Sequence, residues 1–287
     1  MPQTVSVSPA ERAAAQGAAS AVSTAAGAST AAGASAATRG SAASTAAVFN
    51  DVFQTLDAWR AELMPVLRAS TSLAAIDEHV AGQVLPTLLL DDPLLIGAGF
   101  IAAPLDDDPA AVRGPGFDEH SVHFAWWLGP LDAGPIFGST TLPSRLDLST
   151  RGYADYLRDV RTLEWYRVPA ETGETHVTGP YVDHLCTCEY ILTLTTPVVV
   201  NGRFAGVIGA DMAVRRLERE LLPLFLASAM PLALVNDAGR VIISTEPATP
   251  AGSLVAQPAN EAPSAASAPC RGTPFRVIGA PTASARH

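Results

Sequence analysis

The chain has 287 residues and a formal net charge of −10, and all 18 of its Lys and Arg residues are arginines. The acidic balance argues against a nucleic-acid-binding surface, because phosphate contacts need clustered cations. Without lysine there can be no phosphate-binding P-loop, no Schiff base and no Ser–Lys dyad.

Membrane and compartment signals predict a soluble cytoplasmic protein. The most apolar window, residues 84–105, is interrupted by Asp91, Asp92, Pro86 and Pro93. It therefore falls short of the roughly 20 apolar residues of a membrane span. The N-terminus lacks the charged-then-apolar order of a secretory signal. Three cysteines make no disulfide framework, which fits a reducing compartment.

Residues 1–46 are a low-complexity run of Ala, Ser, Thr and Gly. Such a segment has almost nothing large to bury, so it cannot offset the entropy lost on ordering, and we expect it to be disordered. From Val48, apolar residues recur at i, i+4, i+8 and i+11, which predicts a helix. A second helix is expected over roughly 72–90.

The middle of the chain predicts short strands followed by a helix. Apolar runs at 93–104 and 121–129 favour strands, and a third is expected over 134–142. Residues 151–166 have helical composition, and the proline at 169 predicts that this helix ends there.

The last third predicts two hairpins around a helix. Two β-branched runs are joined by Asn201-Gly202, a strong hairpin signal. An amphipathic helix over 214–227, a hairpin over 232–245 and a final strand over 274–280 follow. The fold class is α+β, a PAS-like antiparallel sheet with a long N-terminal helix and a short C-terminal hairpin extension. We place the folded domain at 47–228 and the extension at 229–287.

His184, Cys186 and Cys188 alternate, so on a strand they would share one face. Zinc accepts such ligands, but a structural site needs a fourth ligand that no regular spacing provides. We expect small buried cysteines, with no metal and no cofactor. A metal- or cysteine-dependent enzyme built on these three residues is the alternative.

Catalytic residues are not predicted. The chain has no G-x-S-x-G elbow, and its six histidines are scattered. No set of nucleophile, base and orienting group can be assembled from the sequence.

An aromatic and acidic constellation suggests binding instead. Trp165 and Tyr166 stand together, Tyr181 and Asp183 follow, and Asp211 comes near the end of a strand. Aromatic rings with a carboxylate suit a small cation, through cation–π contact and ion pairing. The alternative is that the aromatics are core residues and Asp211 caps the helix that follows it.

The order of motifs resembles the Cache sensor domain, a PAS-like domain of chemoreceptors and sensor kinases. Trp-Tyr is followed by "TGPYVD", "LTLTTPV", a glycine hairpin and "GVIGADM". The resemblance implies a long N-terminal helix beside an antiparallel sheet whose concave side holds a small ligand. It implies that Trp165, Tyr166 and Asp211 contact an amino acid or amine, with Asp211 on the amino group.

The resemblance also has departures. Family members that bind amino acids carry an arginine two residues before the tryptophan, where this chain has Leu163, while Arg161 lies out of register. Membrane helices and an output domain are not recognised either. We expect a sensor that signals through a partner protein or a second copy of itself. The predicted ligand-binding residues, with Trp127 chosen by strand alternation, are Trp127, Trp165, Tyr166, Tyr181, Cys186, Tyr190 and Asp211.

Overall fold

The computed structural model describes residues 9–69, 72–103, 122–130, 140–146, 160–183, 189–255 and 267–280, with side chains from residue 33 onward. The chain divides into two compact units. One comprises residues 45–223 and 272–274, and the other comprises 1–44, 224–271 and 275–287.

The N-terminal helix is longer than the sequence predicts. α1 runs from Pro9 to Arg68 and so includes most of the segment expected to be disordered. For residues 9–46 that expectation is wrong, and residues 1–8 lie outside the described part. Alanine has the highest helix propensity of all residues, and Thr38 satisfies its buried hydroxyl on the helix's own carbonyls, at 3.2 Å from the Ala34 and Ser35 oxygens.

A six-stranded antiparallel sheet forms the centre of the larger unit, in the order β3-β2-β1-β6-β5-β4. Its strands are β1 (Leu95–Ala102), β2 (Phe124–Leu128), β3 (Ser144–Arg145), β4 (His176–Val182), β5 (Tyr190–Val200) and β6 (Arg203–Ala213). Asn201 and Gly202 join β5 to β6 with φ of 52° and 76°, as a two-residue type I′ turn requires. The predicted hairpin is thus confirmed, whereas most of the predicted strand over 134–142 lies outside the described residues.

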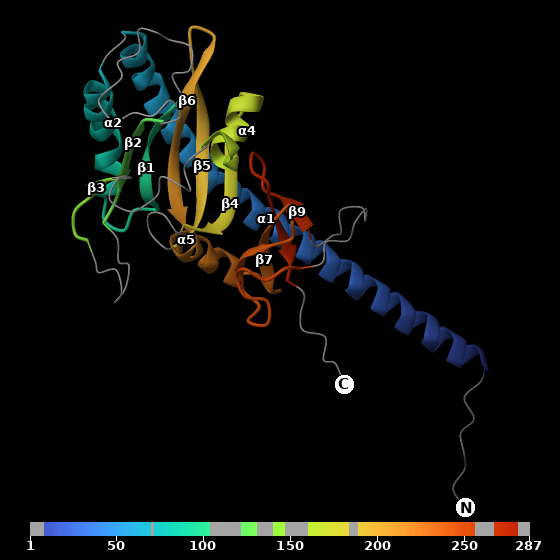
Figure 1. Cartoon of the computed structure of the whole chain (residues 1–287). Coiled ribbons are helices and arrows are strands. Elements are labelled where there is room, and N and C mark those ends of the chain that lie inside the picture. Colours follow the sequence, from blue (N-terminus) through green and yellow to red (C-terminus); the bar gives the residue numbers. More distant parts are fainter. Residues whose placement is uncertain are drawn as a thin grey trace, which may run out of the picture. The chain divides into compact units, whose positions relative to one another are not determined.

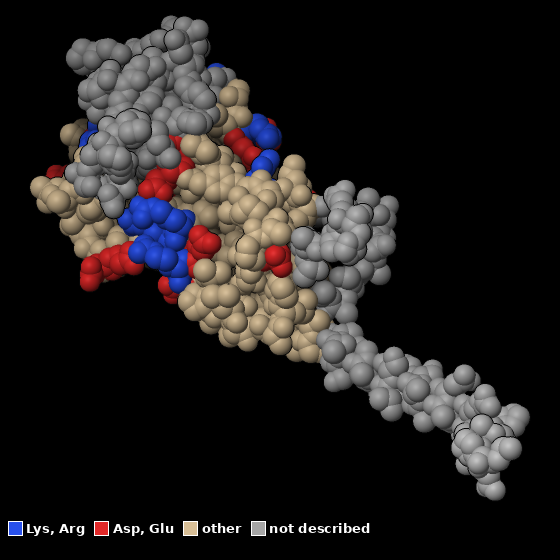
Figure 2. Space-filling model, turned by 90° about the horizontal axis from the view of Figure 1, so that it is seen from below, with Lys and Arg blue, Asp and Glu red and all other residues tan. Residues whose placement is uncertain are grey.

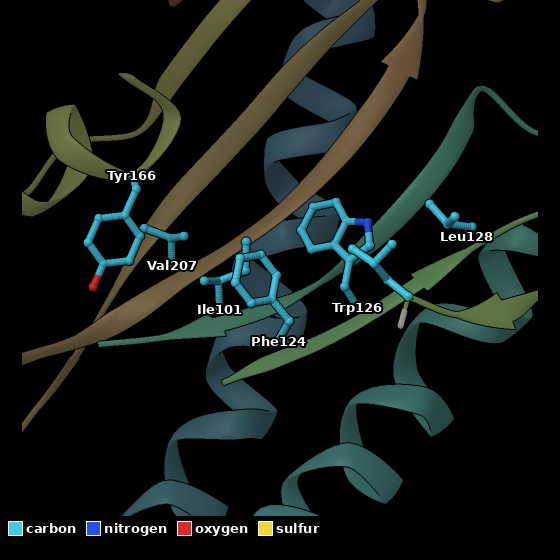
Figure 3. Packing of buried hydrophobic residues seen from close by; sticks show 7 residues of the cluster. Ile101, Phe124, Trp126, Leu128, Tyr166 and Val207 are labelled. Carbon is cyan, nitrogen blue, oxygen red and sulfur yellow. The ribbon is translucent and has the colours of Figure 1, made fainter. Parts of the chain in front are cut away.

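Helices lie on both faces of this sheet. α2 (Leu73–Leu88) packs against β1 and β2 through Ile76, Val80, Val84 and Leu88. Figures 1 and 3 show α1 and α2 on one side of the strands and α4 (Glu164–Thr172) on the other. The long helix and antiparallel sheet confirm the predicted α+β fold.

α4 begins where the sequence predicts a helix to end. A 3₁₀ turn over Val160–Thr162 precedes it, and the helix continues past Pro169 to Gly173, which has a φ of 71°. The proline removes only one intrahelical hydrogen bond from a helix that ends three residues later. Trp165 and Tyr166 therefore stand in its first turn.

The C-terminal extension is a small sheet, more than the predicted hairpin. Its order is β8-β7-β10-β9. β7 (Leu232–Asn236) and β8 (Val241–Ser244) form the hairpin, and β9 (Ser267–Pro269) and β10 (Phe275–Gly279) extend it. β10 joins because Phe275 and Val277 need an apolar neighbour, and both are buried.

α5 (Val214–Leu226) follows β6 directly and carries three arginines. Arg215 pairs with Glu189, Arg219 pairs with Asp92, and Arg216 donates to the carbonyls of Pro93 and Leu95. Figure 2 shows basic side chains next to acidic ones on the face seen from below. Within the described residues, no helix combines the length and the apolar character needed to cross a membrane.

Candidate binding site

The strand register places a row of side chains on the α4 face of the sheet. Asp211 of β6 lies opposite Thr193 of β5 and Gly97 of β1. Thr193 in turn lies opposite Thr178 of β4. Directly paired residues point to the same face, so Asp211 and the two threonines gather on one surface.

Asp211 belongs to a strand and does not cap a helix. β6 continues to Ala213, and α5 begins only at Val214. The alternative that Asp211 is the N-cap of the following helix is therefore wrong. Its side chain instead ends a hydrogen-bonded chain across three strands.

The hydrogen-bonded chain runs from Tyr181 through Thr193 to Asp211. The Thr193 hydroxyl donates to Asp211 Oδ1 at 2.6 Å, and the Tyr181 hydroxyl lies 2.6 Å from the same threonine oxygen. Because the threonine proton is used toward Asp211, Tyr181 donates to Thr193. The sequence predicted Tyr181 and Asp211 for the site, but not the threonine that joins them.

Burial dominates the electrostatics of Asp211. The residue is 7% exposed, and desolvation raises its pKa to about 8. The buried Asp183 carboxylate raises this pKa as well, and the hydrogen bond from Thr193 lowers it. Near neutral pH the carboxyl therefore holds a proton, and a cation placed beside it would favour the ionised form.

Two further threonine hydroxyls lie unsatisfied on this face. Thr195, two residues beyond Thr193 on β5, is fully buried, and Thr178 is buried too. Neither hydroxyl has a hydrogen-bond partner among the residues that the structure describes. Buried hydroxyls normally find a partner, so these two add unused polar capacity beside Asp211.

An apolar cluster with aromatic side chains lies on the same face of the sheet, further from Asp211. Tyr166 of α4 packs edge-on against Phe204 with ring centroids 5.5 Å apart, and Trp165 stacks edge-on against Tyr166 at 6.1 Å. Figure 3 shows Tyr166 beside Val207 and Trp126 further along the sheet. Burial raises the pKa of Tyr166 to about 12, so the phenol stays neutral.

The structure places two predicted residues on the opposite face. Trp127 lies opposite Ala98, and Tyr190 alternates with Ile191, so both point away from the surface of Asp211. Trp127 carries the Arg145 guanidinium 6.0 Å from its ring centroid. Each of the two lies on the opposite face from Asp211 because it has the other parity in its strand, and their roles in binding stay predictions.

Trp126, the neighbour of Trp127 in β2, lies on the same face of the sheet as Asp211. It pairs with Gly99, which pairs with Gly209, in the row next to that of Asp211. Strand alternation could separate the two tryptophans only once the register with β6 was known. The sequence carries no signal for that register.

Cys186 and its neighbours His184 and Cys188 lie outside the described residues, so their predicted roles stay predictions. Among the described residues, no group of three or more His, Cys, Asp or Glu side chains is placed to hold a metal ion.

Comparisons with known proteins agree with this fold. Residues 124–219 match the family model of the first PDC sensor domain of methyl-accepting chemotaxis protein-like proteins. The ligand-binding domain of PctC, an amino acid chemoreceptor of Pseudomonas aeruginosa PAO1 solved with GABA, superposes with a TM-score of 0.50 at 19% identity. The superposition covers 83% of this chain and 93% of that one. Residues 124–219 thus match a sensor domain of the PDC, or Cache, type.

Two curated chemoreceptors match the Cache domain in sequence. PctB of P. aeruginosa PAO1 is 27% identical over 118 residues, and PscA of P. syringae pv. tomato DC3000 is 29% identical over 109 residues. Each match covers 38% of this chain, but only 18% of PctB and 16% of PscA. The resemblance stated from sequence is thereby confirmed for the sensor domain.

Proposed function

We propose that this Cache domain binds a small amine-bearing metabolite, an amino acid or an amine, and passes the signal to a partner. Asp211 holds the ammonium group of the ligand, and Tyr181 and Thr193 position the carboxylate of Asp211. Trp165 and Tyr166 wall the site further along the sheet.

The observation that carries the proposal is the burial of Asp211 within a hydrogen-bonded chain. A carboxylate in an apolar site is costly unless it is protonated or paired. Thr193 fixes its orientation, and no cationic side chain acts on it in the described part of the chain. A ligand ammonium is the group that would complete such a site.

The relatives support this ligand class. PctC is an amino acid chemoreceptor whose structure holds GABA, a compound with an ammonium group at one end. The two curated relatives are methyl-accepting chemotaxis proteins, which fits a role in signal transduction. The output partner is expected to be a signalling protein or a second copy of the chain.

Recognition of a ligand carboxylate is not part of the proposal. Leu163 stands where the resemblance implies an arginine, and it packs against the apolar cluster around Tyr166. The acidic neighbour Asp183 would also repel a carboxylate close to Asp211. We therefore place simple amines ahead of α-amino acids among the candidate ligands.

A thermal-shift screen of the full chain against amines, amino acids and carboxylates of similar size tests the proposal. A ligand at about 100 times its Kd stabilises the folded state by about 2.7 kcal/mol, which raises Tm by several degrees. Stabilisation by amines in the wild type, absent in Asp211→Asn, is the expected result. The proposal fails if amines give no shift or if Asp211→Asn responds as the wild type does.

A further inference from the structure

Along β6, one of the two directions is closed to a ligand that Asp211 holds. Beyond Asp211, toward the end of β6, the face is occupied by the apolar cluster of Ile96, Ile191 and Ala213, against which Tyr181 packs. A ligand that extends along β6 from the carboxylate therefore runs the other way, toward Gly209.

Three glycines line that direction. Gly97 lies opposite Asp211, and Gly99 and Gly209 lie opposite each other in the next row. None carries a side chain that rises from the sheet. At Gly209 the need for glycine is steric, because a Cβ there would lie 2.8 Å from the Leu194 carbonyl oxygen and 2.9 Å from Thr195 Cγ2.

The indole of Trp126 lies across these glycines. A Cβ built on Gly97 would stand 3.0 Å from Trp126 Nε1, and one built on Gly209 would stand 3.6 Å from Cη2 at the other end of the ring. The ring thus reaches from the row of Asp211 over the row of Gly209. It occupies the surface that a ligand would meet first after leaving the carboxylate.

We propose that Trp126 is the residue that sets the length of the ligand. This inference rests on the proposed function, since it assumes that an ammonium sits on Asp211. The Cα atoms of Asp211 and Gly209 are about 7 Å apart in an extended strand, so a chain of a few carbons reaches the indole. Longer chains collide with it, and shorter ones leave its face uncovered.

If Trp126 only packed in the core, replacing it should affect ligand binding no more than replacing its neighbour Trp127. Both side chains are buried, at 4% and 8% exposed, and both lie on β2. They differ in the face to which they point, since Trp127 lies on the side of α2. This pair supplies a test with a matched control in the same strand.

The test titrates straight-chain primary amines from propylamine to octylamine into the full chain by calorimetry. The proteins are the wild type, Trp126→Phe, Trp127→Phe and Gly97→Ala. Trp126→Phe shortens the ring, so the preferred chain should lengthen by one or two methylenes, with about a tenfold gain for the longer amine. Gly97→Ala pushes on the indole from the sheet side and should shift the preference to shorter amines.

Trp127→Phe should keep the wild-type preference while losing comparable thermal stability. The inference is overturned if Trp126→Phe keeps that preference, or if Trp127→Phe changes it equally. Should Trp126→Phe fail to fold, an unchanged preference in Gly97→Ala overturns the inference. Amine binding that depends on Asp211 but not on Trp126 removes this inference alone, whereas no amine binding at all removes the proposed function with it.

Discussion

The two faces of the six-stranded sheet differ in how their acidic side chains are paired. On the α2 side, the Asp77 carboxylate bonds to His123 at 2.8 Å and to Arg145 at 2.9 Å. On the α4 side, the Asp211 carboxyl is buried, and no cationic side chain acts on it among the residues that the structure describes.

The difference shows where the protein tolerates a cost to its stability. A buried acid without a cationic partner lowers the free energy of unfolding. Such groups are expected where a ligand completes the interactions. The α2 face stabilises the fold, and the α4 face is where we place binding.

The substitution Asp211→Asn tests the difference between the two faces most strongly. We expect amine affinity to fall at least a hundredfold, because the ion pair is lost in a buried site. Calorimetry with the best amine from the screen measures the loss. Asp77→Asn, on the other face, is the control and should leave that affinity unchanged.

The same variant should raise the stability of the folded protein. The folded-state pKa of Asp211, about 8, lies above the ordinary value, so the folded protein keeps a proton that the unfolded chain has lost. Wild-type stability should therefore be full below about pH 4 and fall as pH rises toward 8, by several kcal/mol at most. Denaturant unfolding across this range checks the slope, which should be shallower in Asp211→Asn. A wild-type stability that rises over this range would contradict the assignment.

Ligand binding should release a proton. Below about pH 8 the free carboxyl is protonated, and an ammonium ligand favours its ionised form. Affinity should then rise by up to about tenfold per pH unit from pH 6 to 8, and level off above. Titrations in two buffers of different ionisation enthalpy count the released proton, and equal heats in both would refute the release.

Thr193→Val tests the hydrogen-bonded chain at a smaller scale. Removing the hydroxyl takes a donor from Asp211 and an acceptor from Tyr181. We expect about a tenfold loss of amine affinity, the scale of one hydrogen bond to a charged group. Thr196→Val is the matched control, since Thr196 is buried on the other face and its hydroxyl has no partner among the described residues. It should bind normally and be no less stable.

The smallest effect concerns the α2 face itself. Asp77→Asn weakens the bonds to His123 and Arg145, whose partly exposed geometry limits the cost to about 1 kcal/mol of stability. Urea unfolding measures this loss. A change in amine affinity in the same variant would show that the two faces are coupled.

Much of the fold was predictable because it follows from local patterns. The Asn201-Gly202 turn, the strands around it and the amphipathic helix after β6 each have a signal within a few residues. Residues 9–46 are helical although they carry little apolar bulk, because alanine has the highest helix propensity of all residues. The cytoplasmic location stays a prediction.

The sequence by itself determined the residue types of the candidate site, a carboxylate with aromatic neighbours. It also carried the resemblance to sensor domains, which suggested a binding role for these residues. Only the tertiary structure decided which of them meet. The register across β2, β1, β6, β5 and β4 places Thr193 beside Asp211. It also places Trp126 on the face of Asp211, and Trp127 and Tyr190 on the opposite face. The physical reason is that side chains alternate with a period of two, so a shift of one residue between strands exchanges the faces, and no local pattern fixes that shift.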